Sequence, residues 1–152
     1  MLVLICGDRH WGDYRCEVCQ GWVWPCTGCM VTNIRLRDRI KSEIIHLGLD
    51  PDDDVIMHGA AKGADTLAGE VAERMGFKVV RFPADWNKYG KKAGPLRNRQ
   101  MLDEKPDLVL AFHPDLAKSK GTKDMVARAK AAGIVVRHFT GDEDEVEDGL
   151  VY

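Results

Sequence analysis

The strongest constraint on the fold is the regular alternation of short apolar runs with amphipathic segments along the chain. The runs are rich in Val, Ile, Leu and Phe and end near a Gly, a Pro or a polar turn, as parallel strands buried on both faces do. The predicted strands are Leu2–Cys6, Val55–Met57, Lys78–Phe82, Leu108–Phe112 and Ile134–Phe139. The predicted helices between them are Thr32–Leu47, Ala64–Met75, Pro95–Asp103 and Thr122–Ala132.

This order predicts an α/β fold in which right-handed crossovers build a three-layer sandwich around a mainly parallel five-stranded sheet. In the first helix the apolar residues are expected to form one stripe. These residues are Ile34, Ile40, Ile44, Ile45 and Leu47. Cys6, inside the first strand, is expected to be a buried core residue.

Length and charge set the domain organisation. The 152 residues suit one domain, which we assign to residues 1–140. Residues 141–152 form an acidic tail with six carboxylates and no basic side chain, whereas residues 1–140 carry 22 basic and 18 acidic side chains. No apolar run approaches the roughly 20 residues that span a bilayer, and the opening run is too short for a signal-peptide core. We therefore expect a cytoplasmic protein without a membrane partner.

A cysteine-rich insert at residues 14–31 interrupts the pattern after the first strand. Its two CxxC pairs, six residues apart, are Cys16 with Cys19 and Cys26 with Cys29. Four thiolates can close a tetrahedral shell around Zn²⁺, and such a shell leaves no position open for catalysis. The alternatives are disulfides, which a cytosolic chain disfavours, and unligated thiols. The spacing predicts a structural zinc knuckle, with Trp22 and Trp24 packed over the metal or exposed to a partner.

The loops that follow the predicted strands carry the candidate ligand-binding residues, because parallel α/β sheets bind ligands beyond the carboxyl ends of their strands. Two glycine-containing loops precede helices, at Gly59–Asp65 and Lys120–Asp124. Each fits either a tight turn or a phosphate cradle, and the presence of both favours phosphate. Neither loop is a dinucleotide-binding fingerprint or a P-loop.

Charged side chains near these loops extend the candidate site. The segment from residue 87 to residue 100 holds five basic side chains and no carboxylate, so it is either solvated surface or an anion contact. The aspartates at positions 8, 65, 85 and 124 are candidates for ribose hydroxyls or for stabilising a cationic transition state. Two of them, Asp65 and Asp124, equally suit a helix N-terminus. His58 and His113 face a ligand or form structural hydrogen bonds.

The loop sequences, in this order, resemble the YspA-like branch of the SLOG superfamily. The resemblance is carried by Gly7–Trp11, His58–Asp65, Pro83–Trp86, Tyr89–Arg99 and the Gly121-Thr122 turn, and it covers most of residues 1–139. It implies a Rossmann-like sheet and binding of nucleotides or their derivatives. The superfamily includes the Lonely Guy phosphoribohydrolases and the DNA-processing protein DprA. Relative to the Lonely Guy motif, residues 113–120 replace a Pro-Gly-Gly loop, and Asp124 stands where those enzymes place a catalytic Glu.

The residues and the resemblance together give the site predictions. Asp124 and Arg99 are the predicted catalytic residues, and the four cysteines are the predicted zinc ligands. The predicted ligand-binding residues are Gly7, Asp8, Arg9, Trp11, His58, Gly59, Ala60, Lys62, Gly63, Ala64, Asp65, Asp85, Trp86, Arg97, Asn98, Arg99, His113, Gly121 and Thr122.

Three functions follow, in order of preference. The first is a sensor or processing protein that binds a nucleotide or nucleotide derivative. The second is a hydrolase that cleaves the N-glycosidic bond of nucleoside monophosphates, with a carboxylate beside the cationic sugar. The third is a zinc-knuckle module for single-stranded nucleic acid. Local basicity favours a small anionic ligand over nucleic acid. The resemblance alone suggests a homo-oligomer.

Overall fold

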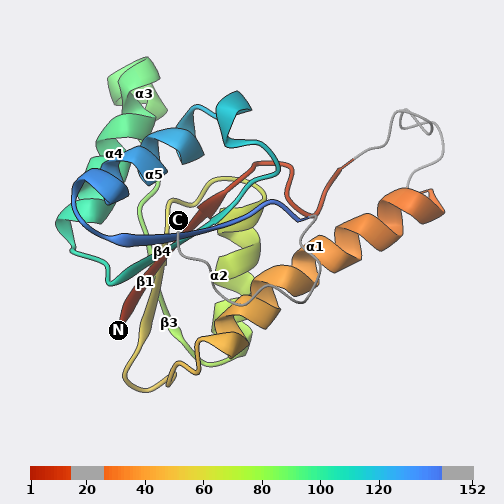
Figure 1. Cartoon of the computed structure of the whole chain (residues 1–152). Coiled ribbons are helices and arrows are strands. Elements are labelled where there is room, and N and C mark those ends of the chain that lie inside the picture. The colour runs from red at the N-terminus through yellow and green to blue at the C-terminus, as the bar shows by residue number, and fades with distance from the viewer. Residues whose placement is uncertain (15–25, 142–152) are drawn as a thin grey trace.

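The computed structural model describes residues 1–14 and 26–141, and its centre is a five-stranded sheet (Figure 1). The strands are β1 (Leu2–Gly7), β2 (Val55–His58), β3 (Lys78–Arg81), β4 (Leu108–Phe112) and β5 (Val135–Phe139). Every neighbouring pair is parallel, and the spatial order is β3-β2-β1-β4-β5. The predicted α/β sandwich with a mainly parallel five-stranded sheet is confirmed.

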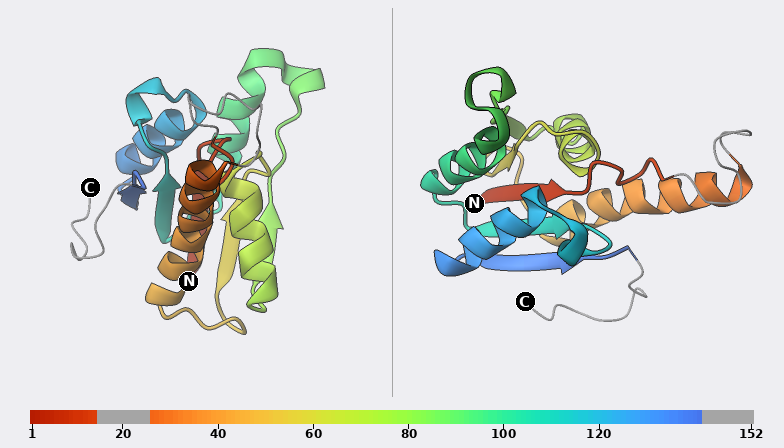
Figure 2. Two further views of the ribbon diagram at one scale, coloured as in Figure 1. Left: turned by 90° about the vertical axis from the view of Figure 1, so that its right-hand side faces the viewer. Right: turned by 90° about the horizontal axis from the view of Figure 1, so that it is seen from above.

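Helices cover both faces of this sheet. One face carries α1 (Thr27–His46) and α2 (Ala64–Arg74), which lie side by side (Figure 2). The other face carries α4 (Ala93–Asp103) and α5 (Gly121–Ala131). Three single-turn elements complete the chain: α3 (Trp86–Tyr89) and the 3₁₀ turns η1 (Gly90–Lys92) and η2 (Leu116–Lys118).

The two faces of the sheet hold separate hydrophobic clusters, because side chains alternate along each strand. From β1, Val3 and Ile5 pack with the residues of α1 and α2. The alternate residue Leu4 packs with Met101 of α4 and Met125 of α5. Cys6 belongs to the same cluster and is 7% exposed, so its predicted place in the core is confirmed.

The first helix differs from its prediction in length and in its buried face. It begins at Thr27, five residues before the predicted start, with Cys26 as its N-cap. The buried stripe is Cys29, Asn33, Leu36, Ile40 and Ile44, whereas Ile34 and Ile45 are more than half exposed. The predicted stripe was therefore wrong at these two isoleucines. The polar residue Asn33 takes an inward position because its amide exchanges hydrogen bonds of 2.7 and 3.0 Å with the backbone of Tyr14.

The remaining predicted elements either agree closely with the structure or lie outside the described residues. The fourth strand matches its predicted bounds, and the later helices begin within two residues of their predicted starts. The Cys16–Cys19 pair, Trp22 and Trp24 lie outside the described residues. Within residues 1–14 and 26–141, no helix has the length and apolar character needed to cross a membrane.

Candidate nucleotide-binding site

The strand order reverses between β1 and β4, at the carboxyl edge of the sheet. The connection after β1 passes through α1 on one face, and the connection after β4 passes through α5 on the other. In open α/β sheets ligands bind at such a point. Gly7 and Phe112, the last residues of the two strands, are register partners, so Asp8 and His113 follow them at this edge.

Asp8 and His113 form a polar pair across this point. The Asp8 carboxylate accepts one hydrogen bond from the Tyr14 hydroxyl and one, of 3.2 Å, from the His10 amide. It also lies 3.9 Å from His113 Nε2. His113 Nδ1 accepts the amide of Asp115 at 3.0 Å, so the ring proton of the neutral form resides on Nε2, facing Asp8. Burial lowers the pKa of His113, and Asp8 opposes that shift. The sequence analysis did not identify Tyr14, because no local motif indicates its contact with Asp8.

A glycine turn brings the loop after β2 against the loop after β1. The Ala64 amide donates to the Asp8 carbonyl at 3.1 Å. Gly63 has φ +78°, and a Cβ at this position would overlap the backbone carbonyls of Asp8 and Arg9. Only glycine therefore allows the two loops to approach this closely.

Most amides of the β2 loop are used within the loop itself. The buried Asp65 carboxylate accepts the amides of Gly59 at 3.0 Å and Ala61 at 3.3 Å, and His58 Nδ1 accepts the amide of Ala60 at 2.9 Å. The amides of Lys62 and Gly63 have no hydrogen-bond partner in the part of the chain that the structure describes. Any phosphate at this loop therefore meets the Lys62–Gly63 end.

Two titratable groups of this loop lie in the interior. Burial raises the pKa of Asp65 to about 6, while the two loop amides, Arg97 and Arg9 lower it against that effect. His58 is 2% exposed, and its Nε2 packs over Gly69 of α2 without a hydrogen-bond partner among the described residues. Burial lowers the pKa of His58 to about 4. Both buried residues thus hold the loop in place by accepting its backbone amides.

Side chains of α4 form hydrogen bonds both with the loop after β2 and with the start of α5. Arg97 donates to the carbonyl of Gly59 and, at 3.5 Å, to that of Phe82. Asn98, 3% exposed, donates to the carbonyl of Gly121 at 3.2 Å and to Asp124 Oδ2 at 3.0 Å. These two predicted ligand-binding residues therefore make structural contacts that fix the loops at the carboxyl edge of the sheet.

The start of α5, the second predicted cradle, is capped from within the chain. Ser119 Oγ accepts the amide of Thr122 at 3.0 Å and that of Lys123 at 3.3 Å. Asp124 accepts both Asn98 Nδ2 and Arg128 Nε, the latter at 2.9 Å. Arg99 lies on the outer side of α4 near Arg128, and no ion pair joins it to Asp124 among the described residues.

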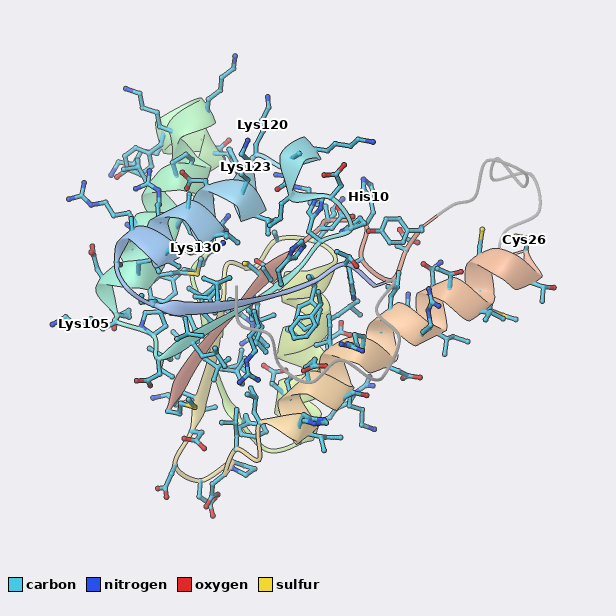
Figure 3. All side chains as sticks on the ribbon, viewed as in Figure 1. His10, Cys26, Lys105, Lys120, Lys123 and Lys130 are labelled. Carbon is cyan, nitrogen blue, oxygen red and sulfur yellow. The ribbon has the colours of Figure 1, made fainter. Side chains whose placement is uncertain are left out.

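Three further predicted residues have other surroundings. Trp11 is 1% exposed, donates from its indole to the Leu36 carbonyl at 2.8 Å and packs edge-on against Phe112, so it belongs to the core. Asp85 caps α3 by accepting the Lys88 amide at 3.0 Å. Trp86 is half exposed, with its ring over Gly94. Exposed side chains at the carboxyl edge include His10, Lys120 and Lys123, whereas Lys105 lies at the other edge (Figure 3).

Half of the predicted zinc knuckle falls within the described residues. Cys26 caps α1, its Sγ accepting the Cys29 amide at 3.4 Å, and Cys29 is 3% exposed. The described part of the chain contains no group of three or more His, Cys, Asp or Glu side chains arranged to hold a metal ion. The partners Cys16 and Cys19 lie outside it.

Comparison with known proteins agrees with the fold and the loops. The model of the YspA, cpYpsA-related SLOG family matches residues 1–89, which include the loops after β1 and β2. The Gene 61 protein of Mycobacterium phage D29 is 37% identical over 146 residues, covering 93% of this chain and 97% of that protein. No solved structure matches the chain significantly. The chain therefore belongs to the YspA, cpYpsA-related SLOG family, and this membership indicates nucleotide-related binding or processing.

Proposed function

We propose that the chain binds a nucleotide or nucleotide derivative at the carboxyl ends of β1, β2 and β4. The observation that carries the proposal is the Asp8–His113 pair at the point where the strand order reverses. Its side chains are 13% and 12% exposed, so both are partly accessible to a ligand at the carboxyl edge of the sheet. A carboxylate at the carboxyl edge of a parallel sheet can accept ribose hydroxyls, as the acidic residue of dinucleotide-binding folds does from a later strand.

The phosphate end of the ligand belongs beside Lys62 and Gly63 in this proposal. Their two amides lie just before α2, where the helix dipole also favours an anion. The side chains of Arg9 and Lys62 are exposed and supply positive charge on the two touching loops. Asp65 then has a positioning role, because its carboxylate holds the loop amides of Gly59 and Ala61.

Binding is favoured over hydrolysis by the state of the predicted catalytic carboxylate. Asp124 is already bound by Arg128 and Asn98, so its negative charge is compensated before any ligand arrives. A hydrolase would require a carboxylate next to the anomeric carbon, and among the described residues Asp8, unlike Asp124, forms no ion pair with a Lys or Arg side chain. Incubation with nucleoside monophosphates and chromatographic detection of released base tests turnover. Release of base that Asp124→Asn abolishes and Asp8→Asn spares would restore the hydrolase assignment with Asp124 as its carboxylate.

Calorimetric titration with nucleoside monophosphates, cyclic dinucleotides and ADP-ribose tests the binding proposal. Asp8→Asn and Lys62→Ala are each expected to weaken binding at least about tenfold, since each removes one charge-assisted contact. Lys105→Ala, at the opposite edge of the sheet, is the matched control and should leave affinity unchanged. Absence of affinity for every probe would refute the proposal.

A structural zinc ion on Cys16, Cys19, Cys26 and Cys29 is the second part of the proposal. Its support is the position of the second CxxC pair, whose thiols lie at the cap and first turn of α1. A metal there would tie the protruding end of α1 to the preceding segment. Metal analysis of protein purified without added zinc should give about one ion per chain. Zinc-free protein that folds normally would exclude the structural role.

A further inference from the structure

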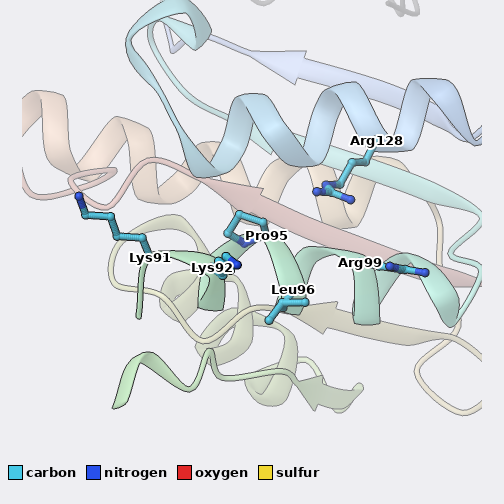
Figure 4. Close-up of a pocket in the computed structure, with 6 residues that line it drawn as sticks. All are labelled: Lys91, Lys92, Pro95, Leu96, Arg99 and Arg128. Carbon is cyan, nitrogen blue, oxygen red and sulfur yellow. The ribbon is translucent and has the colours of Figure 1, made fainter. Parts of the chain in front are cut away.

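An open hollow lies on the outer surface of the α4–α5 layer, beside η1 and the first two turns of α4 (Figure 4). Its volume is about 320 Å³. Five of its residues come from η1 and α4, and Arg128 extends toward them from α5. The lining residues are Lys91, Lys92, Pro95, Leu96, Arg99 and Arg128.

The charge of this hollow is uniformly positive. Four of its lining residues are cationic, and no described residue that lines it is acidic. Lys91, Lys92 and Arg99 take part in no ion pair within the described residues. Unpaired cations of this kind repel one another, so an anionic ligand would relieve an existing electrostatic cost.

Arg128 is oriented by contacts behind the hollow. Its Nε donates to both carboxylate oxygens of Asp124, at 3.0 and 2.9 Å, and Asn98 holds the same carboxylate through Oδ2. This chain of contacts fixes one side of the guanidinium and assigns Asp124 a positioning role. A pre-oriented arginine loses less side-chain entropy when it binds a phosphate than a freely moving one does.

The floor of the hollow is apolar, which narrows the class of ligand. Pro95 and Leu96 lie between the cations, and Leu96 is 37% exposed. An inorganic anion would use the charges and leave this surface in water. A ligand with an aromatic or sugar surface as well as phosphates would cover both, and nucleotides have this combination. The volume is at the lower end of the range for small-molecule sites and suits one nucleotide unit.

We propose that this hollow is a second binding site, which takes the phosphates of a nucleoside polyphosphate or of a short single-stranded oligonucleotide. The cations hold two or more phosphates, and a base or sugar lies against Pro95 and Leu96. The hollow contains none of the residues assigned to the site around Asp8 and His113, so it does not depend on the function proposed for that site.

Binding measurements with three probes test this proposal: a fluorescent oligothymidylate of about eight nucleotides, ATP and inorganic triphosphate. The double variant Lys92→Glu/Arg99→Glu is expected to weaken nucleotide binding at least about tenfold. Arg35→Glu/Lys41→Glu is the matched control, because it makes the same charge change at two exposed residues of α1, on the other face of the sheet. Circular dichroism checks that both double variants fold.

Salt dependence and the floor residue give two further readouts. Each phosphate contact of a single strand contributes about −0.7 to the slope of log K against log salt, so losing two cations should reduce the magnitude of the slope by about 1.4. Leu96→Ala should weaken the binding of nucleotide probes and leave inorganic triphosphate unaffected. Asp8→Asn should leave all three affinities at the hollow unchanged, which separates this test from that of the Asp8–His113 site.

The outcomes divide clearly. If the native protein binds ATP but not oligothymidylate, and the α4 variant alone loses this binding, the site is assigned to free nucleotides. The reverse preference assigns it to nucleic acid, and both results support the proposal. Equal losses of affinity in the α4 and α1 double variants would show that only net charge matters, and this result would overturn the proposal. Inorganic triphosphate binding as tightly as the better nucleotide probe would also overturn it, since the floor would then contribute nothing.

Discussion

At the scale of single residues, Asp65 and His58, at the two ends of the loop after β2, make the free energy of unfolding depend on pH in opposite directions. The pKa of Asp65 rises to about 6 in the folded protein, so its contribution to stability is fully present below its unfolded pKa near 3.8 and is lost as pH rises through about 6. The pKa of His58 falls to about 4, so its contribution is fully present above 6.5 and is lost as pH falls toward 4. The two effects oppose each other across the same pH interval.

Single substitutions should separate these two effects. In Asp65→Asn the histidine effect remains alone, so the free energy of unfolding should rise more steeply between pH 4 and pH 6.5 than it does in the native chain, by on the order of 2–3 kcal/mol. In His58→Gln the free energy should instead fall across that range. Urea unfolding at a series of pH values measures both. Identical pH profiles for all three proteins would contradict the assignment.

Gly63 gives a second prediction at this scale. Gly63→Ala puts a Cβ into the carbonyls of Asp8 and Arg9 at a φ that alanine rarely adopts, so we expect a loss of about 2–4 kcal/mol in unfolding free energy. Gly121→Ala is the control, because no atom lies within 4 Å of its added Cβ and its φ is not left-handed. It should change stability by less than about 1 kcal/mol. Thermal or urea unfolding of the pair distinguishes strain from a general effect of replacing glycine.

At the scale of elements, helix positions follow from local sequence and helix starts follow from capping contacts. The predicted Thr122–Ala132 helix is found one residue earlier, at Gly121–Ala131, and Ser119 accepts the amides of Thr122 and Lys123. The first helix was predicted to start five residues late, because Cys26 and Cys29 were assigned entirely to an insert. The single turn α3 was not predicted, since four residues leave no periodicity to detect.

Ser119 should contribute measurably to the stability of α5. Ser119→Ala removes the acceptor of the Thr122 and Lys123 amides, and loss of such a cap costs about 1 kcal/mol. Ser42→Ala, at an exposed position inside α1, is the control and should be neutral or slightly stabilising, since alanine has the higher helix propensity. Urea unfolding measures the difference. Equal effects of both substitutions would exclude the capping role.

At the scale of the whole molecule, one sheet joins two hydrophobic clusters that have no described residue in common. Successive β1 residues enter opposite clusters, so neither layer of helices can separate without exposing the strand that supports the other. This arrangement predicts a single cooperative unfolding transition.

Substitutions on the two faces should therefore destabilise the same transition. Ile40→Ala in the α1–α2 layer and Met125→Ala in the α4–α5 layer remove fully buried side chains, and each should cost about 2–4 kcal/mol. The exposed Ile45→Ala serves as control and should change stability by less than about 0.5 kcal/mol. Coincident unfolding curves from fluorescence and circular dichroism are expected in each variant. Separate transitions would contradict a single cooperative unit.

The amino-acid sequence by itself determined the α/β class, the five strands, the loops that contain Asp8 and His113, and the loop that leads to Asp65. These features follow from hydrophobic periodicity and turn residues, which are local properties of the chain. Only the tertiary structure decided which side chains meet: Tyr14 on Asp8, Asp8 opposite His113, and Arg99 on the outer surface with Arg128. It also decided which loop amides are already bonded, as those of Gly59 and Ala61 are to Asp65. Such contacts depend on strand order and layer packing, which join residues far apart in the chain and leave no local signal.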